Sequence, residues 1–274
     1  MSGRYRSQFD LSGKTALITG ACGTLGPVFA EALAEFGANL VISDVKPGAA
    51  AAAAAALAAS HGVHAIGVDC DVSSPTAVKA MTAAALSRFG AIDVLLNNAA
   101  NATPDPAAYF ARFEDYSLDE WRRSLSVDLD GMFLVAQSVG SAMAAAERGG
   151  SIIQTASIYA AYGSDNRIYE GAEFKGVAIN NPAVYSTGKA GVLGLTRWLA
   201  TYWADRSIRV NSLVPGGVES GQNDLFKRRY GNRVPLGRMA RREEIAGAVV
   251  WLASDASSYV TGQHIFVDGG LSAW

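Results

Sequence analysis

Short apolar runs alternate with longer stretches of helical character along the whole chain. A short apolar run bounded by turn residues predicts a buried strand, and a longer stretch of helix-forming residues predicts a helix. Strands that alternate with helices form βαβ units, whose strands lie parallel in one sheet. We therefore expect an α/β fold, a Rossmann-type doubly wound parallel sheet of about seven strands with helices on both faces. The strands are expected over residues 14–19, 39–43, 64–68, 93–97, 151–155, 208–214 and 264–267, and the helices over 27–36, 49–59, 75–89, 118–146, 183–204 and 242–253.

The length of 274 residues would suit two domains at roughly 150 residues each. However, no Pro/Ser-rich linker, charge block or internal repeat divides the sequence. We therefore expect a single domain over residues 1–274. A domain of this size buries roughly 75% of the surface of its unfolded chain, which is enough for a sizeable core without disulfides.

The charge balance is close to neutral, because 23 Lys and Arg residues stand against 25 Asp and Glu residues for a net charge of −2. A protein that binds nucleic acid or an anionic membrane needs a basic field, so neither partner is expected. No run of about 20 apolar residues predicts a membrane span. The N-terminal residues lack the apolar core of a signal peptide.

Cysteines and histidines are few in this sequence. Two cysteines, Cys22 and Cys70, cannot form a disulfide framework and fit a reducing compartment, so a cytoplasmic location is expected. Cys22 lies near the expected N-terminus of a helix, where the pKa of a thiol is lowered. The histidines His61, His64 and His264 have no partner at metal-ligand spacing, and we predict no metal site.

The segment after the first expected strand is rich in glycine. Residues 19–26 read TGACGTLG, which places Gly20, Gly23 and Gly26 three residues apart just before a helix. Such a turn brings backbone N–H groups and the helix N-terminus to a pyrophosphate, and glycine allows the tight turn. We therefore expect a dinucleotide at this loop, the alternative being glycines present for steric reasons alone.

An acidic residue, Asp44, ends the second expected strand 18 residues after Gly26. A carboxylate at this position hydrogen-bonds the ribose hydroxyls of the adenosine and repels a 2′-phosphate. No Lys or Arg lies within the glycine-rich loop to offset that repulsion, and Lys46 is the nearest cation. The pattern favours NAD over NADP, unless Asp44 merely caps the following turn.

Tyr185 and Lys189 stand four residues apart in the expected helix 183–204, so both side chains lie on one face. A phenol with an ordinary pKa of about 10 is a poor base at neutral pH. An ammonium one turn away favours the phenolate and makes proton exchange with an alcohol feasible. Ser157, after the fifth expected strand, supplies a hydroxyl to the same end of the sheet.

The ordered series of these motifs resembles the short-chain dehydrogenase/reductase family in its single-domain form. The resemblance extends from about residue 9 to residue 270. It is carried by residues 19–26, DV at 71–72, NNAA at 97–100, Ser157, Tyr185 and Lys189, RVN at 209–211, PG at 215–216, TGQ at 261–263 and VDGG at 267–270.

The resemblance implies a role for each matching residue. Tyr185 would be the acid/base, Lys189 would hold the nicotinamide ribose and lower the pKa of Tyr185, and Ser157 would polarise the substrate oxygen. Ordinary strand-end packing is the alternative for Val72 and Asn97. The implied cofactor contacts are Gly20, Cys22, Gly23, Thr24, Leu25 and Gly26 in the loop, Asp44 at the adenosine ribose, Asp71 and Val72 at the adenine, Asn97 and Ala99 near the ribose, and Pro215, Gly216, Val218 and Ser220 at the carboxamide.

Two residues depart from the family pattern. Thr24 occupies the place of the middle glycine in the loop, with Gly23 before it, so a slightly reshaped turn is expected. Asp128 replaces the asparagine that in the family holds a water between the lysine and bulk solvent. A carboxylate would accept the same hydrogen bonds and favour the Lys189 ammonium, but it cannot donate when it is ionised. Asp128 is therefore counted with the catalytic residues.

A third departure is an insert near residues 163–180, because Ser157 and Tyr185 are 28 residues apart, about twice the family spacing. The insert offers Arg167, Tyr169 and Glu170 to a hydroxylated or acidic substrate, and a solvated surface loop is the alternative. Asn101 is a further candidate for substrate contact. The wording of the insert resembles a subgroup that is linked to bacterial surface-sugar pathways, which points to a sugar or polyol.

Residues 217–240 correspond to the family's substrate lid, and the basic residues at 227–229 and 238–242 would meet an anionic group or form a solvated face. The last strand of the family packs between subunits, so the resemblance implies a homotetramer or homodimer.

We expect an oxidoreductase that transfers a hydride between NAD(H) and a secondary alcohol or ketone, with a sugar, sugar acid or polyol as the substrate. NAD is the expected cofactor, and the partners are a small-molecule substrate and further subunits. Two alternatives stay open: an NADP-dependent 3-oxoacyl-type ketoreductase, and a non-catalytic NAD-binding regulatory protein that kept the fold.

Overall fold

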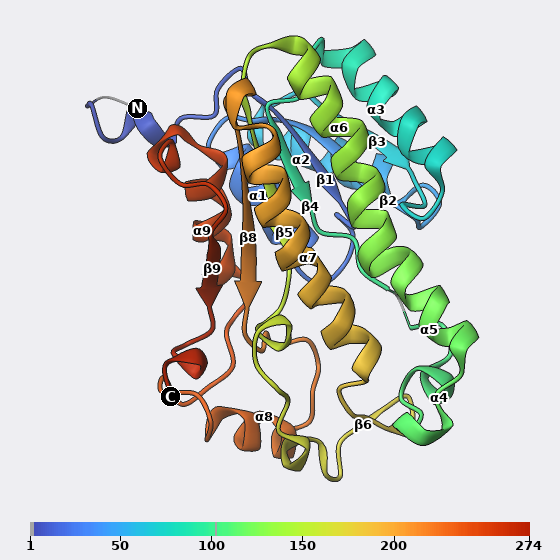
Figure 1. The fold of residues 1–274 in the computed structure, drawn as a ribbon. Coiled ribbons are helices and arrows are strands. Elements are labelled where there is room, and N and C mark those ends of the chain that lie inside the picture. The colour runs from blue at the N-terminus through green and yellow to red at the C-terminus, as the bar shows by residue number, and fades with distance from the viewer. Residues whose placement is uncertain (1–2, 102) are drawn as a thin grey trace.

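The computed structural model describes residues 3–101 and 103–274, which form a twisted parallel sheet covered by helices on both faces (Figure 1). The seven strands lie in the order β3-β2-β1-β4-β5-β8-β9, and every neighbouring pair is parallel. The expected α/β fold is confirmed. The strands are β1 (Thr15–Thr19), β2 (Asn39–Asp44), β3 (Ala65–Asp69), β4 (Val94–Asn97), β5 (Gly150–Thr155), β8 (Ile208–Pro215) and β9 (His264–Val267).

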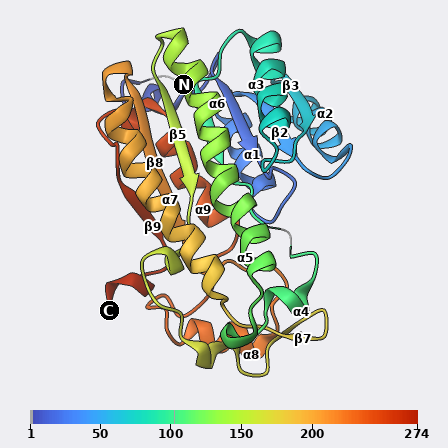
Figure 2. The same cartoon turned by 45° about the vertical axis from the view of Figure 1, so that its right-hand side comes forward.

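Two apolar clusters lie on opposite faces of the sheet and hold the helices against it (Figure 2). Phe29 and Ile245 pack against Ile18 on one face, whereas Met81 and Val139 pack against Leu17 on the other. Successive residues of a strand point to opposite faces, so both faces of β1 are buried. The first face is covered by α1 (Gly26–Glu35), α2 (Ala49–His61) and α9 (Glu243–Ala253), and the second by α3 (Pro75–Phe89), α6 (Met132–Ala146) and α7 (Ala183–Tyr202).

The strand order reverses between β1 and β4, which is where the chain crosses from one half of the sheet to the other. In open α/β sheets, a ligand site forms in the crevice at the carboxyl ends of the strands at such a reversal. The loops that follow β1, β4 and β5 therefore meet at one edge of the sheet and carry the glycine-rich turn, residues 98–101 and Ser157.

The long helix expected over residues 118–146 is not uniform. It consists of α5 (Leu118–Leu125), a π-helical turn (Ser126–Gly131) and α6. By length and apolar composition alone, this is the one helix of the described residues that could cross a membrane, with a mean hydropathy of 1.2. Val135, Val139 and Met143 on its inner side belong to the core, and this packing accounts for its apolar character.

The insert and the lid region pack together below the sheet in Figure 1. Ile168 and Ala172 of the insert share a small apolar cluster with Phe226, Tyr230 and Met239 of the lid region. The insert is therefore anchored to a folded layer at Ile168 and Ala172, whereas its residues 173–176 are exposed. This layer contains a hairpin of β6 (Glu173–Phe174) and β7 (Val177–Ala178), and α8 (Asp224–Gly231), with α4 (Pro106–Tyr109) beside it. Short 3-10 turns occupy Ser7–Phe9, Phe113–Asp115, Ile158–Ala160, Asn166–Tyr169, Ala204–Arg206, Asp255–Ser257 and Leu271–Ala273.

Candidate active site

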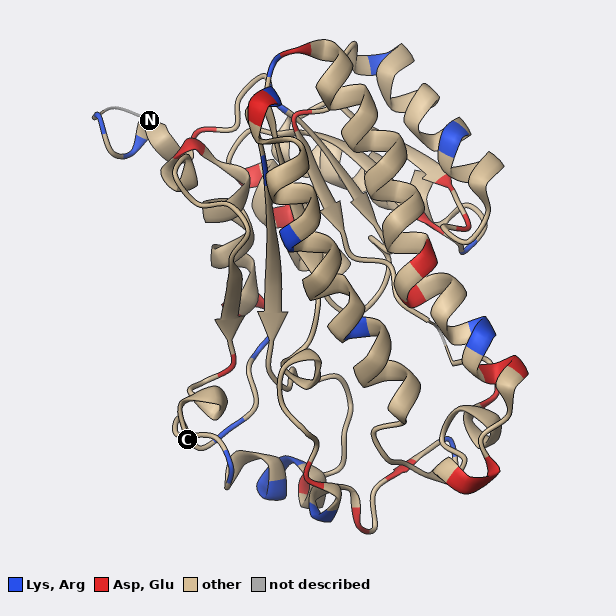
Figure 3. Cartoon of the chain, in the orientation of Figure 1, with Lys and Arg blue, Asp and Glu red and all other residues tan. Residues whose placement is uncertain are grey.

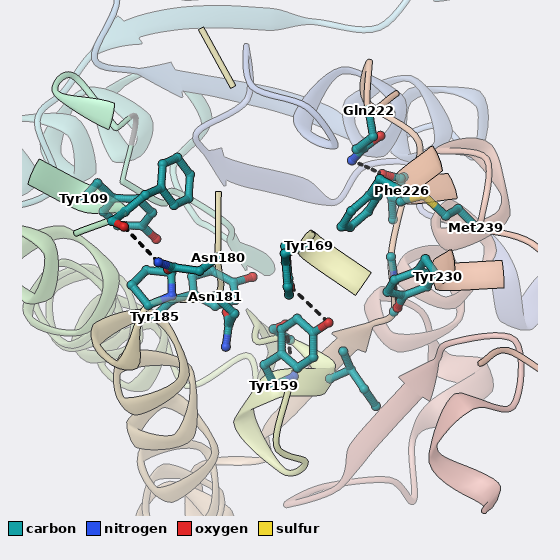
Figure 4. Close-up of a pocket in the computed structure, with 17 residues that line it drawn as sticks. Tyr109, Tyr159, Tyr169, Asn180, Asn181, Tyr185, Gln222, Phe226, Tyr230 and Met239 are labelled. Atoms are coloured by element: carbon teal, nitrogen blue, oxygen red, sulfur yellow. Dashed lines mark hydrogen bonds between the residues drawn. The ribbon is translucent and has the colours of Figure 1, made fainter. Parts of the chain in front are cut away.

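A cavity of about 290 Å³ opens where β5 and α7 meet the insert and the lid region, and both Ser157 and Tyr185 line it (Figure 4). Ser157 follows β5, and its Oγ accepts a hydrogen bond from the backbone N–H of Tyr159 at 3.3 Å. Tyr185 lies in the first turn of α7, and Lys189 lies one turn further along the helix. The three groups that the sequence singled out thus come together from two elements of the fold.

The phenol of Tyr185 is held in its protonated form. Burial raises the pKa of Tyr185 to about 12, and the negative charge of Asp128 acts in the same direction. A hydrogen bond with Ser157 opposes this effect, because it favours the phenolate. The lowered pKa that the resemblance implied for Tyr185 is therefore not found in this structure, where burial outweighs the other effects.

Lys189 is buried, and its Nζ donates a hydrogen bond to the backbone carbonyl of Thr155 at 3.1 Å. Burial lowers the pKa of Lys189, and the carboxylate of Asp128 raises it. The last residue of β5, two positions before Ser157, thereby holds the ammonium near the pocket.

Asp128 occupies the π-helical turn between α5 and α6 and is 1% exposed. Its Oδ1 accepts a hydrogen bond of 2.8 Å from the backbone N–H of Asn101, in the loop that follows β4. Burial raises the pKa of Asp128, whereas Lys189 and Arg123 lower it. Single π-helical turns within α-helices are frequent at functional sites. The turn places this carboxylate between the loop after β4 and the Lys189 ammonium.

Replacing the charge of Asp128 should change the pH dependence of catalysis. Because the carboxylate raises the pKa of Tyr185, Asp128→Asn is expected to lower that pKa and so enlarge the phenolate fraction at a given pH. The pH profile of kcat for alcohol oxidation should then move to lower pH. Asp130→Asn, an exposed change in the same turn, serves as the control. An unchanged profile in Asp128→Asn would contradict this electrostatic coupling.

The glycine-rich loop forms a narrow turn next to the loop after β4. Gly20 has φ of +61°, and a Cβ on it would lie 2.7 Å from Cα of Ala99. A Cβ on Gly26 would lie 2.5 Å from the backbone of Ala21, so the first turn of α1 packs directly on the loop. The backbone N–H of Gly23 donates to the carbonyl of Gly20 at 3.1 Å, while Thr24 is exposed. The turn thus closes without the middle glycine of the family pattern.

Asp44 ends β2 and is 6% exposed. Its two carboxylate oxygens accept hydrogen bonds from the backbone N–H groups of Cys22 at 2.8 Å and Lys46 at 3.1 Å. These bonds hold the carboxylate against the glycine-rich loop. Burial and the charge of Asp44 raise the pKa of the Cys22 thiol, so the expectation of a lowered pKa for this thiol was wrong. The nearby carboxylate and desolvation outweigh the helix N-terminus.

The other cofactor candidates lie at the carboxyl edge of the sheet. Asn97 donates to the carbonyl of Met132 at 2.8 Å, and the backbone N–H of Ala99 donates to Oγ1 of Thr19 at 3.1 Å. Val72 is buried against the π-helical turn at Gly131. Asn97 and Val72 thus pack against neighbouring residues at the strand ends, which is the alternative to a cofactor contact.

The remaining cofactor candidates lie in the pocket wall or outside it. Asp71 is exposed, and its Oδ1 accepts a hydrogen bond from the backbone N–H of Ser73 at 2.9 Å. Gly216 and Val218 line the pocket, and Gly216 directly follows Pro215 at the end of β8. The two remaining candidates stand apart from the cavity wall, since Leu25 is half-buried before α1 and Ser220 is exposed beside Gln222.

The residues that hold a dinucleotide in such folds are therefore in place. The backbone of the glycine-rich loop is free of side chains at Gly20 and Gly23, and the oriented carboxylate of Asp44 stands at the adjacent strand end. A close backbone approach and an acidic residue at the second strand are the features that a pyrophosphate and an adenosine ribose require. These residues fit a nicotinamide dinucleotide.

The candidate substrate residues are divided by the fold. Tyr169 lines the pocket, and its hydroxyl donates to the hydroxyl of Tyr159 at 3.2 Å. In contrast, Asn101 donates through its side chain to Ser124 at 3.1 Å, outside the pocket wall. The charged candidates do not line the pocket and form ion pairs instead: Arg167 pairs with Asp165 at 2.8 Å, and Glu170 pairs with Arg229 at 3.5 Å.

Most of the pocket wall was not found by reasoning from the sequence. It comes from segments far apart in the chain, namely α4, the insert, the start of α7 and the lid region. The one signal that could have been used is the density of aromatic residues in these connecting segments. The additional lining residues include Tyr109, Phe110, Tyr159, Asn180, Asn181, Gln222, Phe226, Tyr230 and Met239.

The chain matches known proteins over nearly its full length. The sequence pattern of the family described as enoyl-(acyl carrier protein) reductase matches residues 20–272. Trans-4-hydroxycyclohexanecarboxylate dehydrogenase of Sinomonas cyclohexanicum is 38% identical over 265 residues, which cover 95% of this chain and 93% of that protein. D-threitol dehydrogenase of Mycolicibacterium smegmatis is 35% identical over 273 residues, or 96% of this chain and 95% of that protein.

A solved structure is similar in both fold and sequence. The gluconate 5-dehydrogenase of Burkholderia cenocepacia J2315, in complex with NADP and tartrate, superposes with a TM-score of 0.86 and 33% sequence identity. The match covers 99% of this chain and 100% of that chain. The likeness therefore extends through the insert and the lid region as well as the sheet.

Proposed function

Because the chain belongs to the short-chain dehydrogenase/reductase family and is an oxidoreductase that acts on CH–OH groups, we propose that it transfers a hydride between NAD(H) and a secondary alcohol or ketone of a sugar, sugar acid or polyol. The observation that carries the proposal is the cavity in which Ser157 and Tyr185 converge beside the buried Lys189. The names of the relatives support a hydroxylated small molecule as the substrate.

NAD supplies the hydride acceptor or donor when it is bound. The chain supplies the proton chemistry and the orientation. Ser157 and Tyr185 hydrogen-bond the substrate oxygen, and Tyr185 Oη takes the hydroxyl proton as an alcohol becomes a ketone. In the reverse direction, Tyr185 gives its proton to the oxygen of the ketone. Lys189 stabilises the phenolate that is present between proton transfers.

The proposed activity is tested by following absorbance at 340 nm with NAD⁺ or NADP⁺ across sugars, sugar acids, polyols and simple secondary alcohols. Turnover with NAD⁺ and a polyhydroxylated compound is expected. If NAD binds in a calorimeter but no compound is oxidised or reduced, the proposal fails and the non-catalytic NAD-binding alternative takes its place.

The preference for NAD over NADP is proposed from Asp44. A 2′-phosphate placed beside this carboxylate would meet a like charge and would displace the hydrogen bonds from Cys22 and Lys46. The similar gluconate 5-dehydrogenase holds NADP in its solved structure, so the preference has to be measured for this chain.

Asp44→Ser is expected to lower the ratio of kcat/KM for NAD to kcat/KM for NADP by at least about tenfold, or ~1.4 kcal/mol. The reason is that the substitution removes the repulsion of the 2′-phosphate. Asp205→Ser, at an exposed site, is the matched control. If wild-type protein uses NADP as well as NAD, or if the ratio does not fall in Asp44→Ser, the assignment of Asp44 is wrong.

We also propose a homotetramer or homodimer in the cytoplasm. Phe133 on α6 and Trp198 and Tyr202 on α7 are large aromatic residues that are 46%, 58% and 59% exposed on the same face of the sheet. Exposed aromatic groups of this kind favour contact with another protein surface. The two free cysteines fit a reducing compartment. Sedimentation equilibrium should give a dimer or tetramer, and a monomer at micromolar concentration would contradict the assembly.

A further inference from the structure

The cavity beside Tyr185 has no charged side chain among the 17 residues that line it. Its polar groups are hydroxyls, amides and backbone atoms, and the rest of its wall is aromatic or aliphatic. A carboxylate or phosphate that entered such a cavity would lose its hydration and gain no ion pair. Transfer of an unpaired charge out of water is strongly unfavourable. The wall therefore disfavours a charged substituent next to the reacting carbon.

Several charged residues of the insert and the lid region form ion pairs with one another. Asp165 pairs with Arg167 at 2.8 Å and with Arg233 at 2.5 Å. Arg229 on α8 pairs with Glu170 of the insert at 3.5 Å. The basic segment of α8 and the charged segments of the insert lie beside each other at the bottom of Figure 3. These ion pairs join the insert to the lid region and leave their cations without a role in the cavity.

The tyrosines of the wall also remain uncharged. Burial raises the pKa of Tyr109, Tyr159, Tyr169 and Tyr230 above the ordinary value of a phenol. They therefore contribute neutral hydroxyl groups and flat rings. Their hydroxyls can form hydrogen bonds with substrate hydroxyls without imposing a charge.

Flat rings stand on two sides of the cavity. Tyr109 lies on the side of Tyr185, and its ring meets that of Phe110 edge to face with centroids 5.0 Å apart. Phe226 and Tyr230 are stacked at 6.0 Å on the lid side (Figure 4). The cavity volume of about 290 Å³ is at the low end of the range for small-molecule sites. Aromatic rings on two sides of a small space match a compact ring better than an extended chain, because a ring loses less conformational freedom on binding.

One acceptor in the wall has no partner. The side-chain nitrogen of Asn180 donates to the carbonyl of Phe110 at 2.8 Å, which fixes the amide orientation. Its Oδ1 is buried and accepts no hydrogen bond from the described residues. An unpaired buried acceptor costs roughly 1–3 kcal/mol. A hydroxyl on the ligand, away from the reacting oxygen, would satisfy it after a small shift of the wall.

We propose that the substrate is an uncharged six-membered ring that carries the reacting secondary hydroxyl and at least one further hydroxyl, bound between Tyr109 of α4 and the aromatic residues of α8. This inference rests on the proposed alcohol/ketone oxidoreductase function and narrows it. A neutral ring fits the uncharged wall, and the second hydroxyl meets Oδ1 of Asn180. Sugar acids and open-chain polyols are then poor substrates.

The test compares four matched probes with NAD⁺: cyclohexane-1,2-diol, cyclohexanol, 4-hydroxycyclohexanecarboxylate and the open-chain threitol. The value of kcat/KM for one stereoisomer of the diol is expected to exceed that of each other probe by at least about tenfold, because unmatched polar groups are rejected strongly. A higher value for the carboxylate or for threitol overturns the inference while leaving the oxidoreductase function intact. If none of the four probes and none of the wider panel reacts although NAD binds, both proposals fail.

Asn180→Leu provides a second measurement that does not depend on how much of the variant folds. The ratio of kcat/KM for the diol to kcat/KM for cyclohexanol is independent of the amount of active enzyme. This ratio should fall from at least about ten in the wild type to about one in Asn180→Leu. A ratio that stays at the wild-type value would exclude Asn180 as the partner of the second hydroxyl and overturn that part of the inference.

Discussion

Tyr185→Phe is expected to lower kcat for both alcohol oxidation and ketone reduction by about 10²–10⁴-fold, which is the usual contribution of a general acid or base. The substitution keeps the ring that lines the cavity but removes the only atom of this side chain that can carry a proton. Ser157 remains and can orient the substrate oxygen, but no other titratable group in the wall is paired with Lys189 across one helical turn. The loss should therefore appear in kcat, while the affinity for NAD measured by calorimetry stays close to that of the wild type.

Tyr259→Phe, which changes a fully exposed tyrosine in the same way, is the control for the loss of a phenolic hydroxyl. Turnover of Tyr185→Phe within a fewfold of the wild type would remove Tyr185 from the mechanism. If the wild type is equally inactive on every alcohol and ketone, the non-catalytic alternative is favoured instead.

Lys189→Met is expected to lower kcat by about 10²–10³-fold. A loss of this size is typical when an enzyme loses one group that stabilises the charge developing in the transition state. Methionine has a similar length and fits a buried position, but it leaves the Thr155 carbonyl without its donor and Asp128 without the opposing charge. The pKa of Asp128, which burial already raises, should rise further when the ammonium is removed. A lower midpoint of thermal unfolding is expected at neutral pH, with partial recovery at acid pH as Asp128 is protonated.

The direction of that recovery follows from linkage between protonation and folding. A carboxyl group with a raised pKa in the folded protein binds more protons there than in the unfolded chain, so stability falls as the pH rises through the folded pKa. Lys79→Met, an exposed change on α3, is the control for the loss of one positive charge. A kcat of Lys189→Met equal to that of Lys79→Met would exclude a role for the ammonium in the chemistry.

The sheet was the most predictable part of this molecule. The expected strands agree with β1, β2, β3, β4, β5, β8 and β9 to within a residue at each end. Strands buried on both faces are continuous apolar runs between turn residues, so the local sequence is enough to predict their position. The same holds for the glycine-rich loop, since its conformation at Gly20 is one that other residues rarely adopt.

The interior of the helix over residues 118–146 was not predictable from its apolar pattern. Its pattern continues through the π-helical turn, and only packing shows that Asp128 bonds to Asn101 there. The pKa of Cys22 was missed for a similar reason. The helix N-terminus is visible in the sequence, but the pKa is raised first by burial and then by the carboxylate of Asp44, which is 22 residues away and is brought close by the turn.

By itself, the sequence determined the fold class, the glycine-rich loop with Asp44, and the chemistry offered by Ser157, Tyr185 and Lys189, because each depends on residue types at short spacings within one or two elements. The tertiary structure alone decided what surrounds the reacting groups. Tyr109 and Tyr230 stand more than 100 residues apart yet line one cavity, and Arg167 and Glu170 of the insert form ion pairs with Asp165 and Arg229 instead of facing it. The physical reason is that local sequence patterns indicate which face of an element is buried, whereas the element that packs against this face depends on contacts between distant segments.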